Sequence, residues 1–326
     1  MEDPELKGSI ADVEGIRVGH AQDPEAKTGL TVILCDRGTQ GAVDLRGSAS
    51  ATRGLDPFRS EHLVGEVNAL LFAGGSAFGL DAAAGAMAYL EERWEGFPVG
   101  KTVVPTVGAA IVFDLNFGEW RVRPDPAMAR RACEAASGEE GPQGSVGAGT
   151  GATVGKLLGI EQAMKGGLGT ASLRSPSGTV VGALAVVNAL GDILDRRSGE
   201  ILAGCRKGRE SRELADSTSL LRAGVSRARF GQNTTLVAVA TDARLPRSQL
   251  HGLAQMAASG VVRAIRPAFT TFDGDAIFSL CRGERKEDLN VLGALAEEAV
   301  ARAINRAVRE ADGFGLLPAW RDLARP

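Results

Sequence analysis

The chain has 326 residues, 44% hydrophobic and 24% charged, and its 37 Lys and Arg against 40 Asp and Glu give a formal net charge of −3. This composition predicts a soluble globular protein with a sizeable core. Because there is no basic excess, binding to nucleic acid or to an anionic membrane is not indicated. The start, MEDPELKGSIADVEG, is acidic and lacks the basic residues and apolar run of a signal peptide, so we expect a cytoplasmic protein without a membrane anchor.

The cysteines give no sign of a metal site. Cys35, Cys133, Cys205 and Cys281 are scattered along the chain without CxxC spacing. This distribution fits reduced thiols and does not indicate zinc binding.

Strands and helices alternate irregularly along the chain. Short apolar or alternating runs bounded by Gly, Asp or Asn predict strands at 30–35, 68–74, 109–115, 179–189 and 235–243. Ala-rich or amphipathic segments predict helices at 76–94, 248–265 and 288–311, the second with Ser248 as its N-cap. Because strands and helices mix without strict βαβ alternation, the pattern favours a layered α+β arrangement over a doubly wound sheet.

One charged segment differs from the rest. Residues 195–230 carry most of the mid-chain charge and no sustained apolar period. We expect a surface loop or a flexible linker here, ending just before Asn233.

A Gly-rich stretch contains an isolated lysine. GSVGAGTGATVGKLLG, at 144–159, does not match the phosphate-loop pattern, because Thr150 stands in place of its first Gly and Leu157 in place of its hydroxyl residue. Lys156 is a single cation among small apolar residues. A partly buried lysine can have a lowered pKa and act as a base, whereas the alternative is a surface lysine near a turn.

The stretch FAGGSAFG resembles a nucleophile elbow around Ser76, but its second Gly, Gly79, comes one residue late. A Ser–His pair would need His20, His62 or His251, and none of these has a context that suggests a site. Ser76 is explained more simply as a helix N-cap.

Two aspartates bracket a glycine in Asp273-Gly274-Asp275, at the start of an apolar run. If this stretch is extended, both carboxylates point to the same side, where their like charges raise one pKa and suit proton transfer or the orientation of a partner. The alternative is an Asp-Gly turn that enters a strand.

The stretch Asn233-Thr234-Thr235 stands at the mouth of the last predicted strand. These residues are either an ordinary strand entrance or a catalytic feature. A Thr hydroxyl needs an adjacent base, which its own α-amine supplies once the residue is an N-terminus. That requires the chain to cut itself, with the Thr234 hydroxyl attacking the Asn233 carbonyl and water hydrolysing the resulting ester.

The sequence resembles the L-aminopeptidase/D-esterase family of self-processing N-terminal-nucleophile peptidases, which includes β-aminopeptidases and 6-aminohexanoate (nylon) oligomer hydrolases. The resemblance covers nearly the whole chain through separate motifs in the same order. They are GIRVGHAQD, LFAGGSAFGLDAAAGAMAYLEE, VPTVGAAIVFDL, GAGTGATVGK, GGLGTAS, VVNALGD, NTTLVAVATDARL and FDGDA.

By this resemblance, Thr234 is the nucleophile and Asn233-Thr234 is the cleaved bond. It implies fragments of residues 1–233 and 234–326 that stay together as one catalytic domain over 1–326. Asp273 and Asp275 match the pair that orients the nucleophile in the nylon-oligomer branch.

Three further positions carry expected roles. Lys156 matches the basic residue near the nucleophile, and Asn188 matches the amide that stabilises the oxyanion. Phe113 stands where several relatives have Tyr, so a hydroxyl contact at this substrate-binding position is expected to be missing.

The resemblance also implies a four-layer α/β/β/α sandwich and a homo-oligomer, such as a tetramer. We expect hydrolysis of a small peptide or another amide through an acyl-enzyme, without a metal or organic cofactor. Two alternatives remain open, namely an acyltransferase of related fold with the same Thr nucleophile, and a serine hydrolase centred on Ser76.

Overall fold

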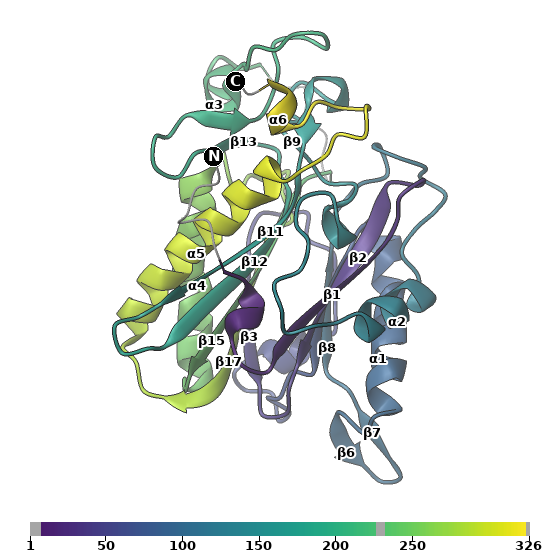
Figure 1. Ribbon diagram of the computed structural model, residues 1–326, viewed down its shortest axis with the longest axis vertical. Helices are drawn as coiled ribbons and strands as arrows, with labels where there is room; N and C mark the ends of the chain where they lie inside the picture. The colour runs from purple at the N-terminus through teal and green to yellow at the C-terminus, as the bar shows by residue number, and fades with distance from the viewer. Residues whose placement is uncertain (1–7, 226–231, 324–326) are drawn as a thin grey trace.

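The structure, a computed structural model, describes residues 8–225 and 232–323. Two five-stranded sheets lie between two pairs of helices, with α4 and α5 on one side and α1 and α2 on the other (Figure 1). The expected four-layer α/β/β/α sandwich is therefore confirmed.

The first sheet contains the N-terminal strands in the order β1-β2-β5-β8-β4. β5 and β8 are parallel, and the other neighbours are antiparallel. β2 and β5 are buried along their whole length, which their continuous apolar sequences anticipate. The strands are β1 (Ile16–Asp23), β2 (Thr28–Cys35), β4 (Thr52–Arg53), β5 (Ala69–Ala73) and β8 (Val107–Ile111).

The second sheet has the order β11-β12-β15-β17-β3. β15 and β17 are parallel, whereas β12 is antiparallel to β15 and β3 is antiparallel to β17. This arrangement brings the start of β15, the end of β12 and the start of β17 together at one end of the sheet. This end, which is formed by strand ends and not by an outer strand, is called the edge below. The strands are β3 (Gln40–Leu45), β11 (Gly167–Arg174), β12 (Val180–Asn188), β15 (Thr234–Ala243) and β17 (Ala276–Arg285).

The two sheets face each other across an apolar core. Phe278 of the second sheet lies between Phe72 and Phe58, with ring centroids 5.7 and 5.5 Å away. Phe72 and Phe278 are fully buried, and each buried side chain of this size contributes about 1.5–3 kcal/mol to stability. This packing fixes the two sheets against each other. It therefore also fixes the position of the strand ends that carry the polar residues described below.

Helices cover the outer faces of both sheets. α1 (Ala83–Glu91) and α2 (Pro126–Glu134) pack on the first sheet, and α4 (Arg247–Ala264) and α5 (Leu289–Arg309) pack on the second. α5 begins after Asp288, whose side chain caps the Asn290 N–H. Its buried face repeats at helical spacing through Leu292, Ala296, Ala299 and Ala303.

Shorter elements connect these layers. The strands are β6 (Phe97–Val99), β7 (Thr102–Val104), β9 (Thr153–Val154), β10 (Met164–Lys165), β13 (Asp192–Leu194), β14 (Ile201–Ala203) and β16 (Ile265–Arg266). The helices are α3 (Ser217–Arg222), α6 (Trp320–Leu323) and the 3₁₀ turns η1 (Ile10–Asp12), η2 (Asp56–Phe58), η3 (Ser76–Ala82), η4 (Gly147–Gly149) and η5 (Ile160–Gln162).

The predicted strands and helices are present, but several boundaries differ. β8 ends at Ile111 instead of continuing to residue 115. The predicted helix at 76–94 begins as the 3₁₀ turn η3, and Ser76 is not an N-cap, because its φ is 55° and the left-handed Gly75 precedes it. α4 starts at Arg247 after Pro246, so the prediction of Ser248 as its N-cap is wrong.

The charged segment at 195–230 is more ordered than predicted. Its described part, 195–225, contains β14 and α3, and Cys205 and Ser217 are buried. The reason is Asp192, whose carboxylate accepts hydrogen bonds from the Cys205 N–H and from the N–H and hydroxyl of Ser217. This order argues against a flexible linker in the described part, where residues 197–200 still lie exposed at the surface as a surface loop would, while residues 226–230 lie outside the described residues.

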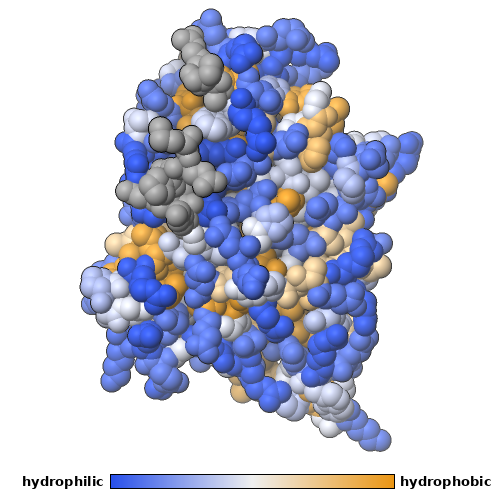
Figure 2. Space-filling view, in the orientation of Figure 1, coloured by the Kyte–Doolittle hydropathy of each residue, from blue (hydrophilic) through white to orange (hydrophobic). Residues whose placement is uncertain are grey.

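The face shown in Figure 2 is largely hydrophilic, with smaller hydrophobic areas between the polar side chains. Within residues 8–225 and 232–323, none of the helices has the length and hydrophobicity that crossing a membrane requires.

Candidate active site

Three strand ends bring the predicted residues together. Asn188, the last residue of β12, pairs with Thr234, the first residue of β15. Asn233 forms a parallel β-bridge with Asp273, and Asp275 immediately precedes β17. The antiparallel and parallel pairings thus place residues that are far apart in the sequence at one edge of the second sheet.

The Asn233–Thr234 peptide lies at the centre of this edge. Both residues are buried. The Thr234 hydroxyl donates to the Asn233 carbonyl oxygen at 2.6 Å, and the Gly274 N–H donates to the same oxygen at 3.0 Å. A Cβ on Gly274 would lie 2.5 Å from the backbone of Ala49, so glycine permits this close approach. The Thr234 hydroxyl therefore lies against the carbonyl of the peptide bond that precedes it, and the Gly274 N–H polarises that carbonyl.

Lys156 points its amine into this edge. Its Nζ donates to the Asn188 backbone oxygen at 2.7 Å, to Asn188 Oδ1 at 2.8 Å and to the Gln232 carbonyl at 3.0 Å. Burial lowers the pKa of Lys156 to about 7, although the charges of Asp273 and Asp275 oppose this shift. The alternative of a surface lysine is therefore wrong, and a fraction of the amine is neutral near pH 7.

The turn before Lys156 explains its position. Gly155 has a φ of 70°, and a Cβ there would lie 2.0 Å from the backbone of Gly204. The Gly155 and Lys156 N–H groups donate to the carbonyls of Gly191 and Leu190. The Gly-rich stretch thus holds the lysine against the end of β12 instead of forming a phosphate loop.

The Asn188 side chain is fixed in one orientation. Its Oδ1 accepts from Lys156 Nζ and from the Thr153 N–H, the latter at 3.0 Å. Its Nδ2 donates to the carbonyls of Phe113 at 3.1 Å and Gln232 at 3.3 Å. Since both donors reach Oδ1, the N–H groups are directed towards Gln232, and Asn188 can donate to an oxygen at that position.

The two aspartates are buried and differ in their contacts. Asp273 Oδ2 accepts from the N–H of Thr270 at 3.0 Å and from its hydroxyl at 2.6 Å, and burial raises its pKa. Asp275 Oδ1 accepts from the Thr235 N–H. Burial and the neighbouring charge of Asp273 raise the pKa of Asp275 well above the usual range. Burial and the neighbouring like charge therefore favour a proton on one carboxyl of the pair over two charged carboxylates.

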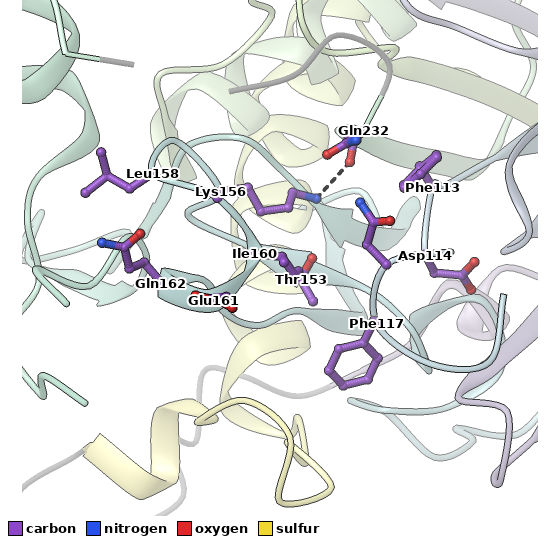
Figure 3. A pocket seen from close by; sticks show the side chains of 12 residues that line it. Phe113, Asp114, Phe117, Thr153, Lys156, Leu158, Ile160, Glu161, Gln162 and Gln232 are labelled. Carbon is purple, nitrogen blue, oxygen red and sulfur yellow. Dashed lines mark hydrogen bonds between the residues drawn. The ribbon is translucent and has the colours of Figure 1, made fainter. Parts of the chain in front are cut away.

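A cavity of about 440 Å³ leads to this edge, and Figure 3 shows Lys156 directed across it to the Gln232 carbonyl. Phe113 and Phe117 lie on one side, so the expected substrate-binding position does line the cavity. The remaining lining residues are Asp114, Asn116, Thr153, Leu158, Gly159, Ile160, Glu161 and Gln162.

Ser76 donates its backbone N–H to the Val112 carbonyl. In the described part of the chain, each histidine has its side-chain partner elsewhere: His20 contacts Thr31, His62 contacts Val64 and His251 contacts Val43. No Ser–His pair supports a serine hydrolase centred on Ser76. The described residues also contain no group of three or more His, Cys, Asp or Glu side chains that could hold a metal ion.

Sequence reasoning missed three contributors to the site. These are the Gly274 N–H, the Thr153 N–H and the Thr270 hydroxyl. Gly274 stands between the two aspartates in the sequence, so its position could have indicated that it belongs to the site. The other two act through contacts that depend on the fold.

The fold is that of the N-terminal-nucleophile hydrolases. The L-aminopeptidase D-Ala-esterase/amidase of Ochrobactrum anthropi, whose structure is described as a variant of that fold, matches 93% of this chain and 86% of its own with a TM-score of 0.68 at 18% identity. Residues 8–315 match peptidase family S58. The chain belongs to this family and is a hydrolase acting on peptide or other amide bonds.

Two relatives are similar over most of their length. An aminopeptidase of Mycobacterium tuberculosis, named as uncharacterized, is 39% identical over 347 aligned positions, covering 97% of each chain. A 6-aminohexanoate-oligomer endohydrolase of Paenarthrobacter ureafaciens is 31% identical over 312 positions, covering 91% of this chain and 84% of that protein.

Proposed function

We propose that the chain cleaves its own Asn233–Thr234 bond and that the freed Thr234 then hydrolyses amide bonds. The observation that carries this proposal is the Thr234 hydroxyl 2.6 Å from the carbonyl oxygen of Asn233, at the edge where Lys156 and the two aspartates converge. A nucleophile, a polarised carbonyl and a partly neutral amine are the groups that an intramolecular acyl shift needs.

Maturation begins with the hydroxyl. Its oxygen attacks the Asn233 carbonyl carbon, while the neutral amine of Lys156 accepts the proton, because the Thr234 nitrogen is still an amide. The Gly274 N–H stabilises the developing oxyanion. The C–N bond then breaks, the Thr234 nitrogen takes the proton that Lys156 accepted and becomes an amine, and water hydrolyses the ester to release the Asn233 carboxylate.

Turnover uses the new chain end. The Thr234 α-amine, with a reference pKa of about 7.7–8.0, acts as the base beside its own hydroxyl. The hydroxyl attacks a substrate carbonyl, Asn188 Nδ2 donates to the oxyanion, and the substrate amine leaves with a proton. Water then hydrolyses the acyl-Thr234 ester. Asp273 and Asp275 orient the ammonium form of the α-amine and balance its charge.

The substrate class follows from this chemistry and from the relatives. The acyl-enzyme route suits peptides and other linear amides, and the relatives' names include an aminopeptidase and a 6-aminohexanoate-oligomer endohydrolase. We propose the same class for this chain, acting as one catalytic domain of fragments 1–233 and 234–326 in a homo-oligomer.

The test is the Thr234→Ala variant compared with wild type. We expect the variant to remain a single chain without amidase activity, while retaining the wild-type circular dichroism spectrum. Thr234→Ser, which keeps a hydroxyl and an α-amine, is the matched control and should still be cut and active. Wild-type amide hydrolysis by the folded Thr234→Ala variant would falsify the assignment.

A further inference from the structure

A second buried lysine lies next to the site and has no part in the reaction described above. Lys165, the last residue of β10, has an exposed fraction of 0%. Its Nζ donates to the carbonyl oxygens of Gly149 and Ala152 at 2.8 Å and of Gly166 at 2.9 Å. These bonds use all three donors of an ammonium group, so the lysine organises the backbone around it.

One of these carbonyls belongs to a peptide unit that also contacts Asn188. The Ala152 C=O and the Thr153 N–H are the two ends of the same planar amide. Lys165 holds the first end, and the second donates to Asn188 Oδ1 at 3.0 Å. Because the unit rotates as a rigid plane, fixing the carbonyl fixes the direction of the N–H.

The direction of that N–H decides what Asn188 offers to the cavity. With Oδ1 occupied by the Thr153 N–H and by Lys156 Nζ, the Nδ2 group faces the Gln232 carbonyl. If the 152–153 peptide turned away, Asn188 Oδ1 would lose the Thr153 N–H and keep Lys156 Nζ and the more distant Thr153 hydroxyl, at 3.4 Å. The amide could then rotate and place an oxygen where an oxyanion donor is needed.

We propose that Lys165 is a positioning residue that acts through the Ala152–Thr153 peptide to keep the Asn188 Nδ2 group directed at the developing oxyanion. This inference rests on the proposed function, in which Asn188 is the oxyanion donor.

The surroundings of Lys165 allow it to keep its hydrogen bond to the Ala152 carbonyl whether or not its amine is protonated. Burial lowers its pKa to about 7, while the charges of Asp114 and Asp312 oppose the shift. The Phe117 ring lies 5.5 Å from Nζ. A neutral amine still has two N–H donors and an ammonium has three, so the contact with Ala152 can persist in both forms.

The experiment is a double-mutant cycle between Lys165 and Asn188. kcat and KM are measured per cleaved chain for wild type, Lys165→Met, Asn188→Ala and the double variant, with a short peptide amide as substrate. We expect Lys165→Met to lower kcat by about 10–100-fold with KM changed less than about 3-fold, and to lower kcat by less than about 3-fold when Asn188 is already Ala.

A purely structural role gives a different result. Equal fold losses in both backgrounds, or wild-type kcat in folded Lys165→Met, overturn the inference. Asn305→Leu is the control, because Asn305 is also buried and loses hydrogen bonds to Leu194 O and the Arg196 N–H. It should lower the melting temperature without lowering kcat.

Two further results are distinguishable. If Lys165→Met yields no folded protein, Lys165→Arg takes its place in the same cycle, since its larger head displaces the Ala152 carbonyl while keeping charge and donors. If Asn188→Ala alone retains wild-type kcat, the proposed role of Asn188 fails, and the positioning role of Lys165 fails with it.

Discussion

The pH dependence of self-cleavage tests the role of Lys156 directly. Only the neutral amine can accept the Thr234 proton, and the pKa of Lys156 is lowered from 10.5 to about 7 by burial. The neutral fraction is then about one tenth at pH 6 and about nine tenths at pH 8. We therefore expect the rate of maturation to rise about tenfold between these pH values and to level off above pH 8.

The direction in which the cleavage rate changes with pH follows from the protonation state of Lys156 that acts as the base. Because the deprotonated lysine is the base, the rate falls as pH drops through the folded-state pKa. An unperturbed lysine, with a pKa of 10.5, would instead give a rate that still rises tenfold per pH unit at pH 8. The pH at which the cleavage rate levels off thus shows whether burial has lowered the pKa of Lys156.

The assay starts from protein unfolded in denaturant before it has been cut, which is then diluted into buffers from pH 5 to 9. The appearance of the 234–326 fragment is followed on denaturing gels. Lys156→Arg is the matched control, since it keeps the positive charge and cannot lose its proton. We expect it to slow cleavage by about 10²–10⁴-fold at every pH. A wild-type rate that is flat from pH 6 to 8, or rapid cleavage of Lys156→Arg, contradicts the reasoning.

Three other predictions concern the same edge. Asn188→Ala should lower kcat of the mature enzyme by about 10²–10³-fold in steady-state amide hydrolysis, because an oxyanion donor is lost; a loss below 3-fold speaks against this role. Gly274→Ala places a Cβ 2.5 Å from the Ala49 backbone, so it should destabilise the fold by about 1–3 kcal/mol in urea titrations and slow self-cleavage; unchanged cleavage refutes the contact. Asp275→Asn removes a charge that raises the pKa of Lys156, so the pH profile of its maturation, measured on gels, should shift to lower pH; an unshifted midpoint contradicts this coupling.

The layers of the fold are predictable from the sequence because they depend on local patterns. Continuous apolar runs such as 30–35 become buried strands, and the helical spacing of Leu292 and Ala299 matches the buried face of α5. Helix starts were less predictable. Ser76 follows a left-handed Gly75 and has a positive φ itself, so backbone geometry, and not side-chain capping, sets the beginning of that helix.

The site was predictable only in part. Thr234 and the two aspartates stand at strand entrances, where the sequence shows polar residues before apolar runs. Asn188 has no such local signal, because its role depends on the pairing of β12 with β15, and only the family resemblance pointed to it. The burial of Lys156 depends on the close approach of Gly155 to Gly204, a contact between segments far apart in the sequence.

The most direct measurement is the intact mass of the purified wild-type protein, together with the N-terminal residue of its smaller fragment. We expect two chains whose masses sum to that of the 33.8 kDa protein plus one water, with Thr234 as the first residue of the second. A single uncut chain that hydrolyses amides, or a smaller fragment that begins at another residue, would contradict it.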